Sequence, residues 1–104
     1  MPKFELAEAA EADLQSIALY TLSKWGVEQA TRYGAILDAH FEAIGNGRAR
    51  TRVFLPHRPE LLVSRIQHHY VFHLTRERKC PLILAVFHEN MDLMARLRNR
   101  LRIE

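Results

Sequence analysis

Two histidines and two arginines in the second half of the chain are the side chains best suited to chemistry. His88 follows the apolar run 82–87 and His69 opens an earlier one, so one imidazole would act as a base and the other as an acid. Arg65 and Arg96 would add positive charge beside such an acid–base pair. Residue types alone do not establish the mutual geometry that this chemistry needs.

The six histidines do not predict a metal site. His69 and His73 would share one face of a strand, but four residues at about 3.3 Å each place them roughly 13 Å apart. A zinc ligand lies only about 2 Å from its metal, so these two side chains cannot bind one ion together. Cys80, expected in a turn, is the single cysteine and has no partner for a disulfide or a zinc motif. We therefore expect neither a metal nor a cofactor.

Charge is divided unevenly along the 104 residues, which are enough for one domain, residues 1–104. Residues 1–42 carry three Lys/Arg against seven Asp/Glu, a net of −4, whereas residues 43–104 carry twelve against five, a net of +7. The basic half predicts a nucleic acid or an acidic protein segment as partner, unless it is simply a solvated face. No apolar run approaches the roughly 20 residues that span a bilayer, and no apolar leader is visible, so we expect a cytoplasmic protein without membrane contact.

The first half of the chain predicts a short strand and two helices. Residues 3–6 alternate polar and apolar side chains, as in a strand that must join a sheet. Residues 9–24 carry apolar side chains at helical spacing, and Gly26 ends that helix. A second helix, 27–44, follows at once, so the two form an antiparallel hairpin. The predicted buried stripes are Ala10, Leu14, Ile17, Ala18, Thr21 and Trp25 in the first helix and Ala30, Tyr33, Gly34, Leu37, Phe41 and Ile44 in the second.

The second half predicts a sheet and a last helix. A basic loop, 48–60, precedes three strands at 61–67, 69–75 and 81–87, which short links join into an antiparallel meander. Leucines at i, i+4 and i+8 then form the apolar stripe of a short helix with arginines on its outer side. The predicted fold is α+β: an N-terminal strand, an antiparallel helix hairpin, a three-strand antiparallel meander forming a small sheet, and a short C-terminal helix.

Several short motifs occur in a fixed order along this framework. They are Phe4-Glu5-Leu6, Ala12-Asp13-Leu14-Gln15-Ser16-Ile17-Ala18-Leu19-Tyr20, Lys24-Trp25-Gly26, Glu28-Gln29-Ala30, Tyr33, Tyr70-Val71-Phe72, Ala85-Val86-Phe87-His88 and Met91-Asp92-Leu93. In order and spacing they resemble the ParE branch of the RelE/ParE toxin superfamily, the toxins of bacterial type II toxin–antitoxin modules. The resemblance covers residues 3 to about 97. The chain departs from the family at Gln67-His68-His69, where relatives usually carry a glycine, and at His73, where a tyrosine is common.

The resemblance implies a protein that poisons DNA gyrase when free and is neutralised by the C-terminal segment of a cognate ParD-like antitoxin. Indirect contact with the DNA in the gyrase complex is a further implied interaction. Polar groups on the meander and its ends are the candidate contacts with target or antitoxin: Arg58, Arg65, His69, His73, His88 and Arg96.

The alternatives are a RelE-like ribonuclease acting on messenger RNA at the ribosome, through His88, His69, Arg65 and Arg96, and an inactive relic that only binds its antitoxin. Against the ribonuclease, no tyrosine follows Tyr70, whereas such toxins commonly place one near the C-terminus.

Structural roles are the simpler interpretation for several other residues. Trp25, Tyr20 and Tyr33 stand at helical core spacing and are expected in the hairpin core. Asn90 is expected to cap the last helix and Asp92 to lie in its first turn, where a carboxylate complements the helix dipole. The arginines of that helix are expected in solvent.

Overall fold

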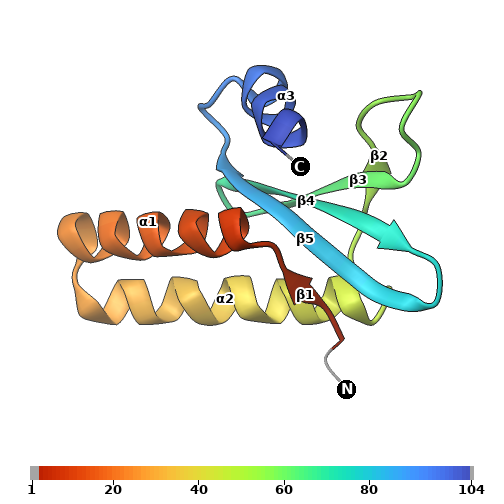
Figure 1. Ribbon diagram of the computed structural model, residues 1–104. Coiled ribbons are helices and arrows are strands. Elements are labelled where there is room, and N and C mark those ends of the chain that lie inside the picture. Colours follow the sequence, from red (N-terminus) through yellow and green to blue (C-terminus); the bar gives the residue numbers. More distant parts are fainter. Residues whose placement is uncertain (1–2, 104) are drawn as a thin grey trace.

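The computed structural model describes residues 3–103 as a mixed sheet with helices on both faces (Figure 1). In chain order the elements are β1 (Glu5–Leu6), α1 (Glu8–Trp25), α2 (Val27–Gly45), β2 (Arg52–Val53), β3 (Leu61–Ile66), β4 (His69–Arg76), β5 (Lys79–His88) and α3 (Leu93–Ile103). The predicted α+β class, the helix hairpin, the central meander and the final helix are confirmed. Within the described residues, no helix is both long and apolar enough to cross a membrane.

The sheet has five strands in the order β1-β5-β4-β3-β2, which are the predicted N-terminal strand, the predicted meander and one further strand, β2. β3, β4 and β5 are the antiparallel meander. β1 adds to β5 in parallel, and β2, inside the predicted basic loop, adds antiparallel to β3. The strand that was not predicted, β2, has only two residues, too few for a period-2 pattern to show. Cys80 lies in β5 and not in a turn, because the β4–β5 turn is shorter than predicted.

The helix hairpin covers one face of the sheet. Gly26 connects the helices with φ +91°, a conformation that favours glycine. The core of this face joins Ala10 of α1, Leu37, Phe41 and Ile44 of α2, and Val71, Ile83 and Val86 of the sheet. Gly45, at the end of α2, lies so close to the Lys3 backbone that no Cβ would fit there. The hairpin is therefore anchored to the sheet near the N-terminal strand.

The other face of the sheet packs against α3. Leu97 is buried there with Leu61, Val63, Phe72 and Leu84. Asp92 caps α3, because its Oδ1 accepts a hydrogen bond from the Ala95 N–H at 3.1 Å. The predicted cap, Asn90, lies two residues earlier in the preceding turn.

Part of the predicted hairpin core is wrong. Trp25 is 70% exposed and Tyr20 is 60% exposed, whereas Tyr33 is half-buried. Figure 1 shows the reason: the turn of the hairpin projects beyond the sheet, so the last residues of α1 have no strand beneath them. Helical periodicity identifies which residues share a stripe but not where the opposing sheet ends.

Candidate functional site

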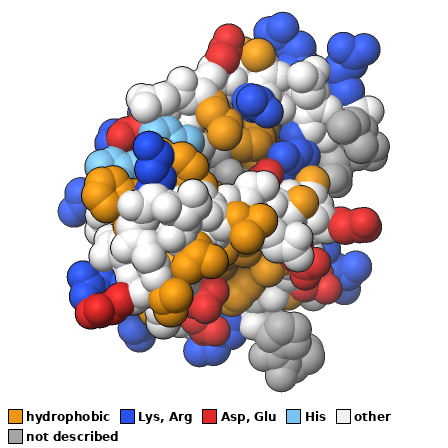
Figure 2. All heavy atoms as spheres, turned by 90° about the vertical axis from the view of Figure 1, so that its left-hand side faces the viewer, with side chains coloured by type: hydrophobic (Ala, Val, Ile, Leu, Met, Phe, Trp, Pro, Cys, Tyr) orange, Lys and Arg blue, Asp and Glu red, His pale blue; other side chains and the backbone are white. Residues whose placement is uncertain are grey.

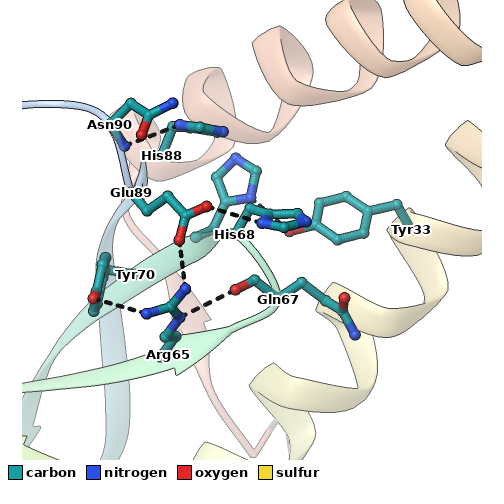
Figure 3. Close-up of polar contacts among 9 residues, drawn as sticks. Tyr33, Arg65, Gln67, His68, Tyr70, His88, Glu89 and Asn90 are labelled. Atoms are coloured by element: carbon teal, nitrogen blue, oxygen red, sulfur yellow. Dashed lines mark hydrogen bonds and ion pairs between the residues drawn. The ribbon is translucent and has the colours of Figure 1, made fainter.

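The β3–β4 turn and the end of β5 bring a set of polar side chains together at one end of the sheet (Figure 3). On the hairpin side, His69 and His88 are cross-strand partners whose rings meet edge to face, with centroids 5.2 Å apart. The Tyr33 hydroxyl is hydrogen-bonded to Nδ1 of His69 at 2.5 Å. The Asn90 N–H donates to Nδ1 of His88 at 3.1 Å. Both histidines are thus held in position by neighbours.

A second group surrounds Glu89. The carboxylate of Glu89 accepts from the Arg65 guanidinium and, at 2.9 Å, from Nδ1 of His68. These partners, with the hydrogen bond from His68 as the largest cause, lower the pKa of Glu89. Arg65 also lies over the ring of Tyr70, 5.5 Å from its centroid, and donates to the Tyr70 hydroxyl at 3.3 Å. Figure 3 shows Arg65 between Glu89 and Tyr70. The Glu89 carboxylate therefore already partly neutralises the charge of Arg65.

Burial governs the protonation of the inner histidines. It lowers the pKa of His69 to about 4, with smaller contributions from the nearby His88 and His68. Burial, with a contribution from His40, likewise lowers the pKa of His73 to about 4. His73 is only 3% exposed, and its Nδ1 has no hydrogen-bond partner among the described residues. Both side chains are neutral at pH 7 and belong to the interior.

A groove of about 950 Å³ opens next to this histidine group. The hairpin forms one wall through residues that include Tyr20, Trp25 and Tyr33. The end of β5 and the following turn form the floor, and Arg96 and Arg100 of α3 form the other wall. Figure 2 faces the hairpin end of the molecule and shows hydrophobic side chains spread across it beside the histidines, with charged side chains around them. The groove thus combines apolar and cationic surfaces.

The six predicted contact residues do not form one surface. His69, His88 and Arg96 line the groove. Arg65 is outside it, on the sheet face that carries Tyr70. His73 is buried and does not reach a partner from its position. Arg58 lies in the β2–β3 connection, paired with Glu60 at 2.6 Å.

The sequence did not indicate that Tyr33, Asp13 and Arg100 belong to the site. Tyr33 was expected only as core, yet its hydroxyl meets His69. Asp13 and Arg100 pair with each other across the groove wall at 3.0 Å. Arg100 had been expected in solvent, and nothing in a helix with alternating arginines distinguishes it from its neighbours. For Asp13 the sequence does carry one signal, because this carboxylate directly precedes Leu14 of the apolar stripe and so lies near the buried face of its helix.

The four groups considered for RNA cleavage are only partly together. His69 and His88 are adjacent, but His69 is buried and hydrogen-bonded, and the Arg65 guanidinium is held by Glu89. Arg96 is exposed on α3. No three His, Cys, Asp or Glu side chains converge into a metal-binding group in residues 3–103.

This architecture, a small α+β domain with a groove between its helix hairpin and its last helix, fits the RelE/ParE toxin type. A family model for the ParE toxin of the type II toxin-antitoxin system, parDE, matches residues 4–93. The chain belongs to this ParE toxin family.

Individual relatives agree with that assignment. Toxin ParE of Escherichia coli is 39% identical over 102 residues, covering 98% of this chain and 99% of that protein. Toxin ParE1 of Caulobacter vibrioides is 33% identical over 101 residues, covering 93% of this chain and 99% of that protein. A solved structure described as the chromosomal ParDE TA system from P. aeruginosa matches with a TM-score of 0.67 at 16% identity, over 82% of this chain and 92% of that one. This last likeness supports the fold.

Proposed function

We propose that this ParE-family toxin inhibits DNA gyrase in the cytoplasm when it is free, and that a ParD-like antitoxin neutralises it by covering the groove. The toxin acts by contact with its target and not by covalent chemistry of its own. The observation that carries this proposal is the groove itself, in which exposed aromatic side chains stand opposite arginines of α3.

The groove has the properties of a protein-binding surface. Trp25 and Tyr20 are large, exposed and placed on a rigid helix, and such side chains supply most of the binding energy in protein interfaces. Met91 adds an adaptable apolar contact at the floor. Arg96, on the opposite wall, would meet a carboxylate of the partner. An amphipathic acidic segment of the antitoxin fits this combination.

Action by contact is supported by the state of the candidate catalytic groups. An efficient general base works best with a pKa near the operating pH, but burial holds the pKa of His69 at about 4. Its Nδ1 is already bound to Tyr33, and Arg65 is already bound to Glu89. These groups rigidify the end of the sheet, and His88 and Arg96 remain accessible to a partner.

Controlled expression in bacteria tests the proposal. Expression without antitoxin is expected to arrest growth, with DNA synthesis falling before protein synthesis, and co-expression of the antitoxin is expected to restore both. An early fall in protein synthesis with cleaved messenger RNA would instead support ribosome-dependent ribonuclease action. Normal growth with abundant folded protein would indicate a relic that only binds its antitoxin.

A further inference from the structure

A second hollow lies away from the groove, on the β2 side of the sheet. It has a volume of about 450 Å³ and is lined by Arg50, Thr51, Arg52, Val63, Ser64, Arg65 and Tyr70. We call it the arginine recess. None of its seven lining residues is an Asp or a Glu, although Glu89 binds Arg65 from outside it. We propose that the arginine recess binds a single strand of nucleic acid, with phosphates on Arg50 and Arg52 and one unstacked base on Tyr70.

The two free arginines are placed to follow a phosphate backbone. Arg50 and Arg52 are exposed, and neither forms an ion pair with a residue in the part of the chain that the structure describes. They are two residues apart where the chain enters β2, so both can contact the backbone of one strand. Guanidinium groups also match phosphate oxygens in a two-pronged geometry.

Tyr70 supplies the wall on which a base would stack. It is paired directly with Arg65 across β3 and β4, and the Arg65 guanidinium lies over its ring, so a base would stack on the surface that this ring and the guanidinium plane form together. Grooves that bind single strands combine cationic side chains along the backbone with aromatic rings that accept any base. A duplex keeps its bases stacked within the helix, so an aromatic wall in a small recess favours an unpaired strand.

An acidic peptide is a poorer match for this surface. Protein partners anchor themselves through apolar or aromatic side chains in the centre of an interface, where charge is depleted. The aliphatic residue of the lining, Val63, is 1% exposed, so the recess presents one half-buried aromatic ring and no apolar pocket. The groove beside Trp25 has that character, which assigns the two surfaces to different partners. Binding by the arginine recess does not depend on the gyrase proposal and is measured on the toxin alone.

Fluorescence anisotropy with labelled 12-nucleotide oligothymidylate and oligouridylate tests the inference, at 50 and 200 mM salt. Arg50→Ala with Arg52→Ala is expected to weaken binding by about tenfold or more at the lower salt concentration, and to reduce the slope of log affinity against log salt by about 1.4, since each lost phosphate contact removes about 0.7. The matched control is Arg98→Ala with Arg102→Ala on α3, which removes the same charge from exposed positions and is expected to change affinity less than twofold. Comparing the two oligonucleotides shows whether DNA or RNA is preferred.

Tyr70 variants test the stacking step. Tyr70→Phe keeps the ring and is expected to bind as the wild type, whereas Tyr70→Leu keeps an apolar side chain without a ring and is expected to lose about tenfold in affinity. Unchanged melting temperatures show that the recess variants are folded. The inference is overturned if the wild type does not bind at 50 mM salt, if the α3 control loses as much as the recess variant, or if Tyr70→Leu binds normally. A 12-residue polyglutamate that displaces the oligonucleotide at equal concentration would also overturn it, in favour of an acidic peptide.

Discussion

Asp13 of α1 and Arg100 of α3 form a two-pronged ion pair, with both nitrogen–oxygen distances at 3.0 Å. The pair also hydrogen-bonds backbone groups of β5 where no neighbouring strand of the described chain reaches them. β1 pairs with β5 only at Leu82 and Ile83. Beyond that point Asp13 accepts from the Val86 N–H at 2.9 Å, and Arg100 donates to the Leu84 carbonyl at 2.8 Å. One side-chain pair therefore takes the place of a neighbouring strand and ties α1, β5 and α3 together.

Removing either partner of this pair is expected to destabilise the protein. Both side chains are only 17% exposed, so Arg100→Ala or Asp13→Ala leaves a largely buried charge and an unpaired backbone group. We expect a loss of about 2 to 3 kcal/mol in the free energy of unfolding, measured by urea denaturation. Arg98→Ala, on the exposed side of the same helix, is expected to stay within about 0.5 kcal/mol of wild type. Equal midpoints for Arg100→Ala and Arg98→Ala would contradict this structural role.

Buried histidines make stability depend on mild acid. Folding holds the pKa of His69 and His73 near 4, whereas the unfolded chain has the ordinary value near 6.5. Between these pH values the unfolded state binds more protons, so stability is full above about pH 6.5 and falls as the pH drops towards 4. Each histidine contributes a slope of at most about 1.4 kcal/mol per pH unit.

The variant His73→Leu isolates this effect, because leucine fills the buried site without a titrating ring. Urea midpoints measured between pH 7.5 and 5 are expected to fall less steeply for His73→Leu than for wild type. His57→Gln, at an exposed position, is the control and is expected to keep the wild-type slope. If the His73→Leu and wild-type slopes agree, the unfavourable protonation lies elsewhere.

Antitoxin binding is expected to depend on the aromatic wall of the groove. Trp25→Ala and Tyr20→Ala should each weaken the complex with the ParD-like antitoxin by at least tenfold, because exposed aromatic anchors dominate interface energies. The stability of the free toxin should change little, since both side chains are mostly in solvent. Leu19→Ala is a matched control, because Leu19 is 67% exposed on α1 but does not line the groove. Calorimetric titration measures the antitoxin affinity of all three variants. An equal loss of affinity for Leu19→Ala would mean that the antitoxin does not bind in the groove.

Toxicity is expected to require His88 and Arg96, the accessible polar groups of the groove. The double substitution His88→Ala and Arg96→Ala removes two residues that line the groove and leaves the buried cores intact. Growth arrest on expression should weaken, while the melting temperature stays close to that of wild type. Full toxicity of the folded double variant would show that gyrase binds another surface of the toxin. His57→Ala is the control, because His57 is an exposed histidine outside the groove.

The elements with a long apolar period were predictable from sequence, and the features that depend on distant pairing were not. The stripe Leu37, Phe41 and Ile44 identified the buried face of α2 correctly. The strand β2 has two residues and shows no period of its own, whereas the alternation of residues 3–6 indicated β1. Trp25 lies on an overhanging part of the hairpin, which only the length of the sheet determines.

The candidate site divides in the same way. The polar end of β5 at His88 was predicted because it follows a strongly apolar strand. The meeting of Tyr33 with His69 and of Asp13 with Arg100 joins residues 36 and 87 positions apart, and no local pattern encodes such a pair. The burial of His73 likewise depends on α2 covering its face of the sheet.

The proposal that this ParE-family chain poisons gyrase is tested most directly by ATP-dependent supercoiling and DNA cleavage with purified gyrase, in the presence and absence of the folded protein. Supercoiling is expected to fall while cleaved DNA accumulates, and the ParD-like antitoxin is expected to reverse both effects. Unimpaired supercoiling with no cleaved DNA, in the presence of correctly folded toxin in excess over active gyrase, would contradict the proposal.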